Sequence, residues 1–294
     1  MLEALVPYID PPELELGPLT LRPFGPLVAA ALIFGRSRCM EYARRKDLDQ
    51  ALFGQFLLWM LLAGFTISHL ISVFFYYPHE LAKNPWVVLQ IWNGLSSVGG
   101  FFGGCVGGYF FLRVYCARRP MGAQPMLIYG DTCVFGLLLG WCFGRAGCSI
   151  VHDHPGKIIA EGTFMAVGPW PDGRWRYDLG LIELAFTIVL MLWVYFGTRW
   201  EKWPPGRLTG LALTVYAPLR FVLDALRSDE GVRGVSPIPD ARYLGLTPAQ
   251  WFTFSFLAVG VWMLWLRRPR AADLAYARDS ERIRREAEAA ATAT

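Results

Sequence analysis

Long apolar runs separated by short polar segments dominate this sequence of 294 residues. Seven of the runs are near the length that a helix needs to cross about 30 Å of hydrocarbon. The runs cover residues 19–34, 51–75, 87–112, 126–143, 179–196, 208–226 and 251–266. The pattern therefore predicts an all-α, polytopic membrane protein with about seven transmembrane helices.

The charged residues between the runs alternate along the chain. The segments 36–46, 113–119 and 199–207 are basic, as is the chain from residue 267, whereas the intervening segments are acidic or mixed. Because basic loops stay in the cytoplasm, this alternation predicts an N-terminus outside and a C-terminus in the cytoplasm. We expect a membrane domain over 1–268, outer-side loops at 150–178 and 227–247, and a charged cytoplasmic tail at 269–294.

The composition supports a membrane protein and limits its chemistry. Charged residues make up 18% of the chain, whereas soluble domains carry about 25%. Six cysteines show neither a C-x-x-C motif nor a zinc spacing, and His152 and His154 have no other ligand cluster beside them in the sequence. There is also no nucleotide-binding loop. No metal, cofactor or nucleic acid is therefore expected.

One arginine at the end of an apolar run points to an anion-binding site. Arg145 stands in Gly144-Arg145-Ala146-Gly147-Cys148, directly after the run 134–143. Arginine keeps its proton, so inside a membrane boundary it needs an anion, and its planar fork suits phosphate or carboxylate. A side chain that snorkels at a helix end is the alternative interpretation. Asp131 at the start of the same run, and a second arginine pair at Arg220 and Arg227, favour the anion site.

Several further motifs occur in the order and spacing of a known family. Asp131 precedes Gly144 by the interval of an Asp, twelve residues and Gly-Arg-x-Gly. The others are Asp10-Pro11, Gly17-Pro18, Trp92-Asn93-Gly94, Glu183, Tyr216 followed by Arg220, and Leu246-Thr247-Pro248-Ala249-Gln250-Trp251. The chain resembles the prolipoprotein diacylglyceryl transferases of bacterial inner membranes.

This resemblance implies a reaction, its partners and a location. The family moves the diacylglyceryl group of phosphatidylglycerol to the lipobox cysteine thiol of a preprolipoprotein and releases glycerol phosphate. The implied partners are phosphatidylglycerol, preprolipoprotein signal peptides and membrane lipids, and the implied location is the inner membrane with several passes. On this basis Arg145 and Arg227 would hold the phosphate as fixed cations, with Asp131 and Glu183 keeping them in place. The wider substrate site would comprise Arg220, Tyr216, Gly99, Gly100, Gly147 and Cys148.

Glycines crowd the third run and leave two interpretations open. Gly99 and Gly100 belong to a glycine-rich stretch that also includes 103–104 and 107–108. In lipid such small residues usually allow helices to pack closely. They would alternatively form a groove in which a lipid approaches the backbone.

The chain departs from the family at three polar positions. Val98 stands where the family has a histidine, Cys148 where it has an asparagine, and Phe24 where it usually has a tyrosine. Because only a thiolate attacks well, a base is needed, and His152 is the predicted one, with His154 and His69 as alternatives. Three functions stay open: this transferase, a transferase with a different acceptor, and a non-catalytic lipid- or lipoprotein-binding paralogue.

The charge alternation makes a testable prediction of topology. A reporter fused after Arg270 is expected to be cytoplasmic, because the segment before it is basic, and one inserted near Gly173 is expected outside. Paired phosphatase and fluorescent-protein fusions in cells measure this. The opposite location at either position would contradict an outer-side site.

Overall fold

The computed structural model describes residues 6–12, 14–16, 19–91, 94–118, 126–230, 232 and 241–268. The predicted tail 269–294 lies outside these residues, as do residues 231 and 233–240 of the predicted loop 227–247. The chain divides into two compact units. The first unit comprises Met1–Cys39, Val134–Trp200 and Leu219–Pro239, and the second comprises Met40–Cys133, Glu201–Pro218 and Asp240–Thr294.

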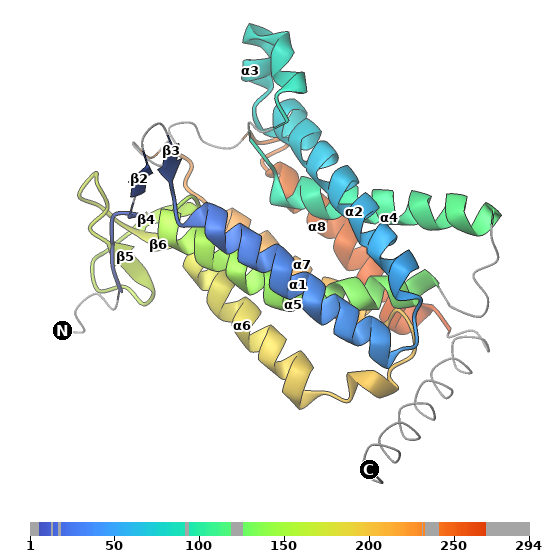
Figure 1. The fold of residues 1–294 in the computed structure, drawn as a ribbon. Helices are drawn as coiled ribbons and strands as arrows, with labels where there is room; N and C mark the ends of the chain where they lie inside the picture. Colours follow the sequence, from blue (N-terminus) through green and yellow to red (C-terminus); the bar gives the residue numbers. More distant parts are fainter. Residues whose placement is uncertain are drawn as a thin grey trace. The chain divides into compact units, whose positions relative to one another are not determined.

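Helices make up most of the described chain (Figure 1). The α-helices are α1 (Phe24–Arg45), α2 (Gln50–Ile71), α3 (Pro78–Lys83), α4 (Ser97–Arg118), α5 (Met126–Val151), α6 (Leu179–Gly197), α7 (Arg207–Ala225) and α8 (Pro248–Val261). Two of them continue as π-helical turns, η1 (Ser72–Tyr76) and η4 (Trp262–Leu266), and two short 3-10 turns are η2 (Pro85–Leu89) and η3 (Trp200–Lys202). The strands are β1 (Val6–Pro7), β2 (Leu14–Leu16), β3 (Leu19–Leu21), β4 (Pro155–Ile159), β5 (Ala166–Gly168) and β6 (Trp175–Asp178).

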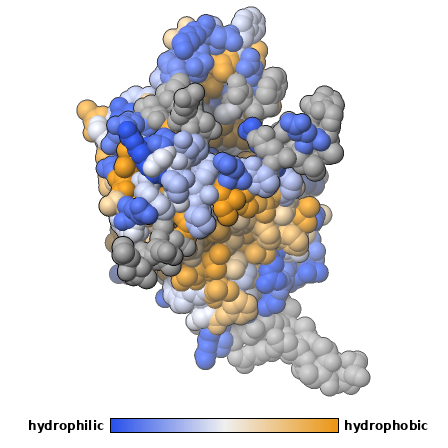
Figure 2. Space-filling view, turned by 90° about the vertical axis from the view of Figure 1, so that its left-hand side faces the viewer, coloured by the Kyte–Doolittle hydropathy of each residue, from blue (hydrophilic) through white to orange (hydrophobic). Residues whose placement is uncertain are grey.

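Five helical segments are long and apolar enough to cross a membrane. They are Gln50–Tyr76, Met126–Val151, Leu179–Gly197, Arg207–Ala225 and Pro248–Leu266. Large apolar side chains on these helices are exposed, for example Phe65 on α2 and Val189 and Phe196 on α6. Figure 2 shows many hydrophobic residues exposed on the face in view. Such a surface suits lipid rather than water, so the protein is a helical membrane protein with several spans.

The other two predicted runs were misplaced. Residues 19–21 form β3, and α1 begins only at Phe24, directly after Pro23. Proline fits the first turn of a helix but not its interior. The run 87–112 was predicted as one helix, yet residues 85–89 form a separate 3-10 turn and α4 begins at Ser97. Neither α1 nor α4 is among the five segments, since α1 carries several charges and α4 many glycines.

The run that carries Arg145 also extends further than predicted. It was expected to end at residue 143, but α5 continues for about two more turns to Val151. No proline interrupts it, and the helix ends at His152, whose backbone takes a left-handed conformation with φ 51°. Arg145 and Cys148 therefore project from one continuous helix rather than from a helix end.

Residues 150–178 fold into strands, which an all-α prediction did not include. Strands β4, β5 and β6 join β1 in a four-stranded sheet of order β1-β5-β6-β4, with β1 parallel to β5 and the other pairs antiparallel. In Figure 1 these strands lie at the ends of α5 and α6 within the first unit. The amide of Lys157 donates to the carbonyl of Leu226 at 2.8 Å, and Gly156 forms a bridge with Arg227. The sheet is thereby attached to the C-terminal end of α7.

The glycines of α4 pack against α2 in the second unit. A Cβ atom added at Gly99 would lie 2.9 Å from Cα of Ser68, and one added at Gly103 would lie 2.7 Å from the carbonyl oxygen of Ala63. These approaches leave no room for a side chain. They favour the close-packing interpretation for Gly99, whereas a Cβ added at Gly100 would meet no atom closer than 3.9 Å.

A second close helix contact yields a stability prediction. A Cβ at Gly136 of α5 would collide with Gly35 and Cys39 of α1, whose amide nitrogen would lie at 2.9 Å. We expect Gly136→Ala to lower the free energy of unfolding by about 1–3 kcal/mol, measured as the melting temperature of the protein in detergent. The control is Gly54→Ala in α2, where nothing lies within 4 Å, so the better helix former leaves stability equal or higher. Equal melting temperatures for Gly136→Ala and wild type would rule out this contact.

Candidate active site

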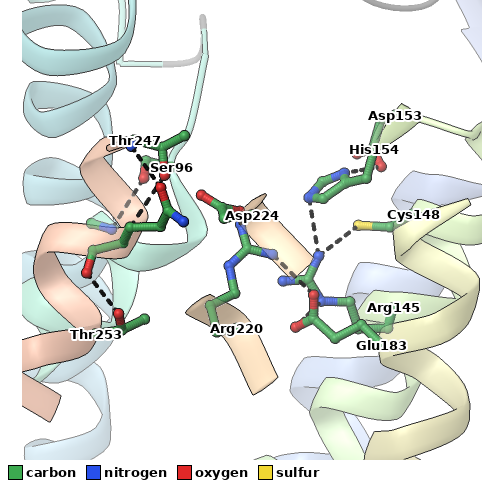
Figure 3. A network of polar contacts seen from close by, with 12 residues as sticks. Ser96, Arg145, Cys148, Asp153, His154, Glu183, Arg220, Asp224, Thr247 and Thr253 are labelled. Carbon is green, nitrogen blue, oxygen red and sulfur yellow. Dashed lines mark hydrogen bonds and ion pairs between the residues drawn. The ribbon is translucent and has the colours of Figure 1, made fainter. Parts of the chain in front are cut away.

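A buried carboxylate joins two buried arginines in the first unit. Oε1 of Glu183 lies 2.8 Å from Nε of Arg145, and its Oε2 lies 3.0 Å from Nη1 of Arg220. Arg220 Nη2 in turn contacts Asp224 Oδ1 at 2.8 Å. All four side chains are at most 5% exposed. Figure 3 shows them pointing toward one another from three helices, and we call these four residues the ion network.

The sequence places each member of the ion network on a defined helix face. Arg220 and Asp224 are four residues apart on α7, which puts them on one side of that helix. Glu183 lies near the start of α6, where the side chain of Asp178 caps the helix by accepting from the amide of Leu181 at 3.0 Å. Arg145 projects from α5. The network therefore fixes α5, α6 and the end of α7 to one another.

Trp141 completes the surroundings of Arg145. It lies one helical turn earlier on α5, and the guanidinium carbon of Arg145 is 4.5 Å from the centre of its ring. Its indole N–H also donates to Glu183 at 3.3 Å. Arg145 is only 2% exposed, stacks on an indole and pairs with a carboxylate. The structure therefore excludes the interpretation of Arg145 as a snorkelling side chain at a helix end.

A histidine, an aspartate and a cysteine meet on the other side of Arg145. Nη1 of Arg145 lies 3.1 Å from Nε2 of His154 and 3.8 Å from Sγ of Cys148. Nδ1 of His154 lies 2.5 Å from Oδ1 of Asp153. These contacts are drawn in Figure 3. The imidazole thus lies between a carboxylate and a guanidinium.

The two neighbours of His154 define which ring nitrogen carries its proton. The Asp153 carboxylate only accepts hydrogen bonds, so Nδ1 must donate to it. The Arg145 guanidinium only donates, so Nε2 must accept and holds a lone pair. A neutral imidazole that is oriented by a carboxylate and directs a lone pair into a site has the arrangement of a general base.

Asp153 stays ionised because of the hydrogen-bond donor and the arginines beside it. Partial burial acts to raise its pKa, but the adjacent His154, together with Arg145 and Arg227, outweighs burial and holds the pKa below the usual range. The Asp153 carboxylate is therefore charged at neutral pH. It is protonated only in acid below the ordinary aspartate pKa of about 3.9. Arg227 is half-buried at the end of α7, where its backbone bridge to Gly156 holds it beside this loop. The structure thus brings Arg145, Arg227 and Arg220 into one unit.

His152, the predicted base, has a structural position instead. Its Nδ1 lies 2.6 Å from Oδ2 of Asp178 and its Nε2 lies 3.1 Å from the carbonyl of Ile9. Its ring stacks on Tyr8 at 4.3 Å. Both nitrogens therefore face acceptors, and the ring connects the N-terminal strand to the cap of α6. His154, whose Nε2 instead faces Arg145, has the geometry that was predicted for His152.

Asp131 was expected to hold an arginine, and this too is corrected. In the second unit its carboxylate accepts from the amides of Gly206 and Thr209, both at 2.8 Å, and from the hydroxyl of Thr209 at 2.7 Å. These donors lie around the start of α7, so the carboxylate satisfies amides that a helix N-terminus leaves without intrahelical partners.

The remaining predicted residues are spread over both units. Tyr216 belongs to the second unit, with its ring 6.2 Å from that of Phe101. Gly147 belongs to the first unit and packs against Phe24, whose ring carbon would lie 2.9 Å from an added Cβ. His69 is fully buried between the carbonyls of Gly94 and Val87, so its ring secures that turn.

Comparison with known proteins identifies the family to which this chain belongs. The family model for prolipoprotein diacylglyceryl transferase matches residues 11–266, and the chain belongs to this family, which makes it a transferase. It is 27% identical over 282 residues to the phosphatidylglycerol–prolipoprotein diacylglyceryl transferase of Phenylobacterium zucineum, covering 88% of this chain and 93% of that one. The enzymes of the same name from Staphylococcus xylosus and Legionella pneumophila are 26% and 24% identical, over 76% and 89% of this chain and 80% and 98% of their own.

The contacts of Arg145 predict that lysine cannot replace it. A single ammonium cannot contact Glu183, His154 and Cys148 at once as the guanidinium does. We expect Arg145→Lys to lower the transfer rate at least about 100-fold, measured with purified protein in detergent. The control is Arg174→Lys. The side chain of Arg174 is 53% exposed and pairs with Glu230 at the surface, so we expect this variant to keep the wild-type transfer rate. Activity near wild type in Arg145→Lys would leave this arginine only a role in packing.

Proposed function

We propose that the protein transfers the diacylglyceryl group of phosphatidylglycerol to the lipobox cysteine thiol of preprolipoproteins and releases glycerol phosphate. The observation that carries this proposal is the Asp153–His154 pair held against Arg145, next to the buried ion network. The names of the relatives contain both phosphatidylglycerol and prolipoprotein, which supports this choice of lipid and protein substrate.

The reaction sets two requirements that these residues meet. The bond between the diacylglyceryl carbon and the phosphate oxygen breaks, and a carbon–sulfur bond forms in its place. Negative charge grows on the departing phosphate, and preorganised cations stabilise it more in the transition state than in the ground state. Arg145 and Arg227 supply those cations, while Glu183 and Arg220 keep Arg145 in place before the lipid binds.

His154 meets the second requirement, removal of the thiol proton. Its Nε2 lone pair takes the proton from the incoming cysteine, and Asp153 stabilises the imidazolium that forms. In the structure this lone pair accepts from Arg145. A phosphate that binds Arg145 would draw that N–H away and free Nε2 for the thiol. Lipid binding would then prepare the base for the second substrate.

Val98 in place of the family's histidine is consistent with this assignment. Valine cannot accept a proton, and Val98 is buried in α4. Because Arg145, Cys148 and His154 lie close together along the chain and contact one another, the chain has a base without any contribution from α4. The same valine favours the second candidate, a non-catalytic lipid- or lipoprotein-binding paralogue.

The topology is part of the proposal. We infer seven passes through the bacterial inner membrane, with the N-terminus outside and the C-terminal tail in the cytoplasm. The alternating basic segments support this orientation. On it, the end of α5 and the sheet that follows face outward, toward secreted proteins and outer-leaflet phosphatidylglycerol.

The test follows transfer with purified protein, phosphatidylglycerol and a lipobox peptide, measuring the peptide's mass and the released glycerol phosphate. We expect His154→Ala to slow transfer by about 10²–10⁴-fold, because a general base contributes this much. Asp153→Asn is expected to do the same by favouring the wrong tautomer. His79→Ala, a surface histidine paired with Glu80, is the matched control and keeps the wild-type rate.

Two outcomes would contradict parts of the proposal. Full activity in His154→Ala would remove this residue as the base. If the wild type binds phosphatidylglycerol but transfers nothing to the peptide, the non-catalytic paralogue is the better interpretation.

A further inference from the structure

Three different ligand groups converge beside Arg145 at the end of α5. A ring nitrogen of His154, a carboxylate oxygen of Asp153 and Sγ of Cys148 all lie within 4.8 Å of one another. We propose that these three side chains bind a single thiophilic divalent cation such as Zn²⁺, and that the bound cation inhibits the enzyme. The binding rests on this geometry alone, whereas the inhibition rests on the proposed function.

The donor set suits a zinc-like ion. Thiolate and imidazole together favour Zn²⁺ over Mg²⁺ or Ca²⁺, which prefer oxygen ligands. Bonds of about 2.0–2.3 Å in a tetrahedron separate the ligand atoms by roughly 3.3–3.8 Å. A pair at the 4.8 Å limit therefore needs to approach by about 1–1.5 Å, and the contact between Asp153 and His154 at 2.5 Å needs to open if Nδ1 is the ligand. The Asp153 side chain is 38% exposed and has room to turn. Three protein ligands leave a fourth position for water.

The backbone explains why this cluster forms although the spacing of its residues in the chain is not a zinc motif. Helix α5 carries Cys148 and ends at His152, where the left-handed conformation redirects the chain. Asp153 and His154 are thereby brought back beside Cys148. His152 takes no part, since both of its nitrogens are bound to Asp178 and Ile9. Of the His-x-His pair, His152 thus holds Asp178 and Ile9, whereas His154 belongs to the cluster.

The positive charge of Arg145 does not exclude a cation here. Its guanidinium is already paired with Glu183 at 2.8 Å, which offsets its charge locally. A Cys148 thiolate and the Asp153 carboxylate together bring two negative charges, which balance those of the metal. The N–H of Arg145, 3.8 Å from the sulfur, would stabilise the thiolate as an outer partner.

Metal binding and base catalysis exclude each other at His154. A cation at Nε2 takes the lone pair that would accept the thiol proton. A cation at Nδ1 moves the ring proton to Nε2, which then faces the Arg145 guanidinium with a proton and no lone pair. At either nitrogen the base is lost, so occupancy of the site stops transfer.

The binding test uses the tag-free, full-length protein in detergent, first with Co²⁺ and then with Zn²⁺ as competitor. Co²⁺ bound to a thiolate gives a charge-transfer absorption that reports the cysteine ligand without any activity measurement. We expect one equivalent of Co²⁺, displaced by Zn²⁺. Cys148→Ser and His154→Gln are expected to weaken binding by more than the roughly 10–100-fold that loss of an outer partner costs. Cys105→Ser and His79→Ala, each outside the cluster, are the matched controls and keep wild-type binding.

The outcomes separate this site from the proposed function. Absence of the absorption in the wild type, or unchanged binding in both Cys148→Ser and His154→Gln, would overturn the metal site. If Co²⁺ binds as expected but the protein transfers no lipid with or without a chelator, the site stands and the transferase proposal falls. If the wild type is active, Zn²⁺ inhibits it and a chelator restores the original rate, both stand.

Discussion

Arginine cannot lose its proton, and this constraint shapes the first unit. Arg145 and Arg220 are both nearly inaccessible to solvent, and each would be strongly unfavourable there without an anion. Glu183 serves both through its two oxygens, so three helices must meet at one carboxylate. Removing one partner from such a group typically costs about 3–5 kcal/mol. The same arrangement that lets the helices assemble therefore leaves a guanidinium fixed in a water-poor site, where it can act on a phosphate.

The end of α5 shows how one backbone feature assigns different tasks to neighbouring residues. His152, Asp153 and His154 are consecutive, yet the left-handed conformation at His152 sends its ring to Asp178 and Ile9, while His154 contacts Arg145. Asp178 in turn caps α6, the helix that carries Glu183. The last residue of β6, Asp178, thus positions the helix that carries Glu183, and the amide of Leu179 that follows it donates to the carbonyl of His154.

Strongly apolar runs and local motifs carried most of what sequence could predict. The bounds of α6 and α7 follow from their hydropathy, and the Gly-Arg-x-Gly motif with Glu183 and Arg220 identified three members of one site. Periodicity gave no signal for the short strands of residues 150–178, nor for the continuation of α5 past Gly144. Which of His152 and His154 lies beside Arg145 depends on the left-handed backbone at His152. The partners of Asp131 depend on how the chain folds around the start of α7. Neither is visible in a pattern of residue types.

Proximity along the chain explains how such a site can tolerate the loss of an imidazole from another helix. Arg145, Cys148 and His154 lie within ten consecutive residues, so the turns of α5 and the bend after it determine their relative positions. Arg227 joins them through a backbone bridge to Gly156, two residues beyond His154. A base placed on α4 would instead depend on how that helix packs, and the glycine contacts of α4 are committed to α2. A valine at position 98 therefore leaves α4 without a proton acceptor there, while Arg145 and the neighbouring His154 keep their geometry.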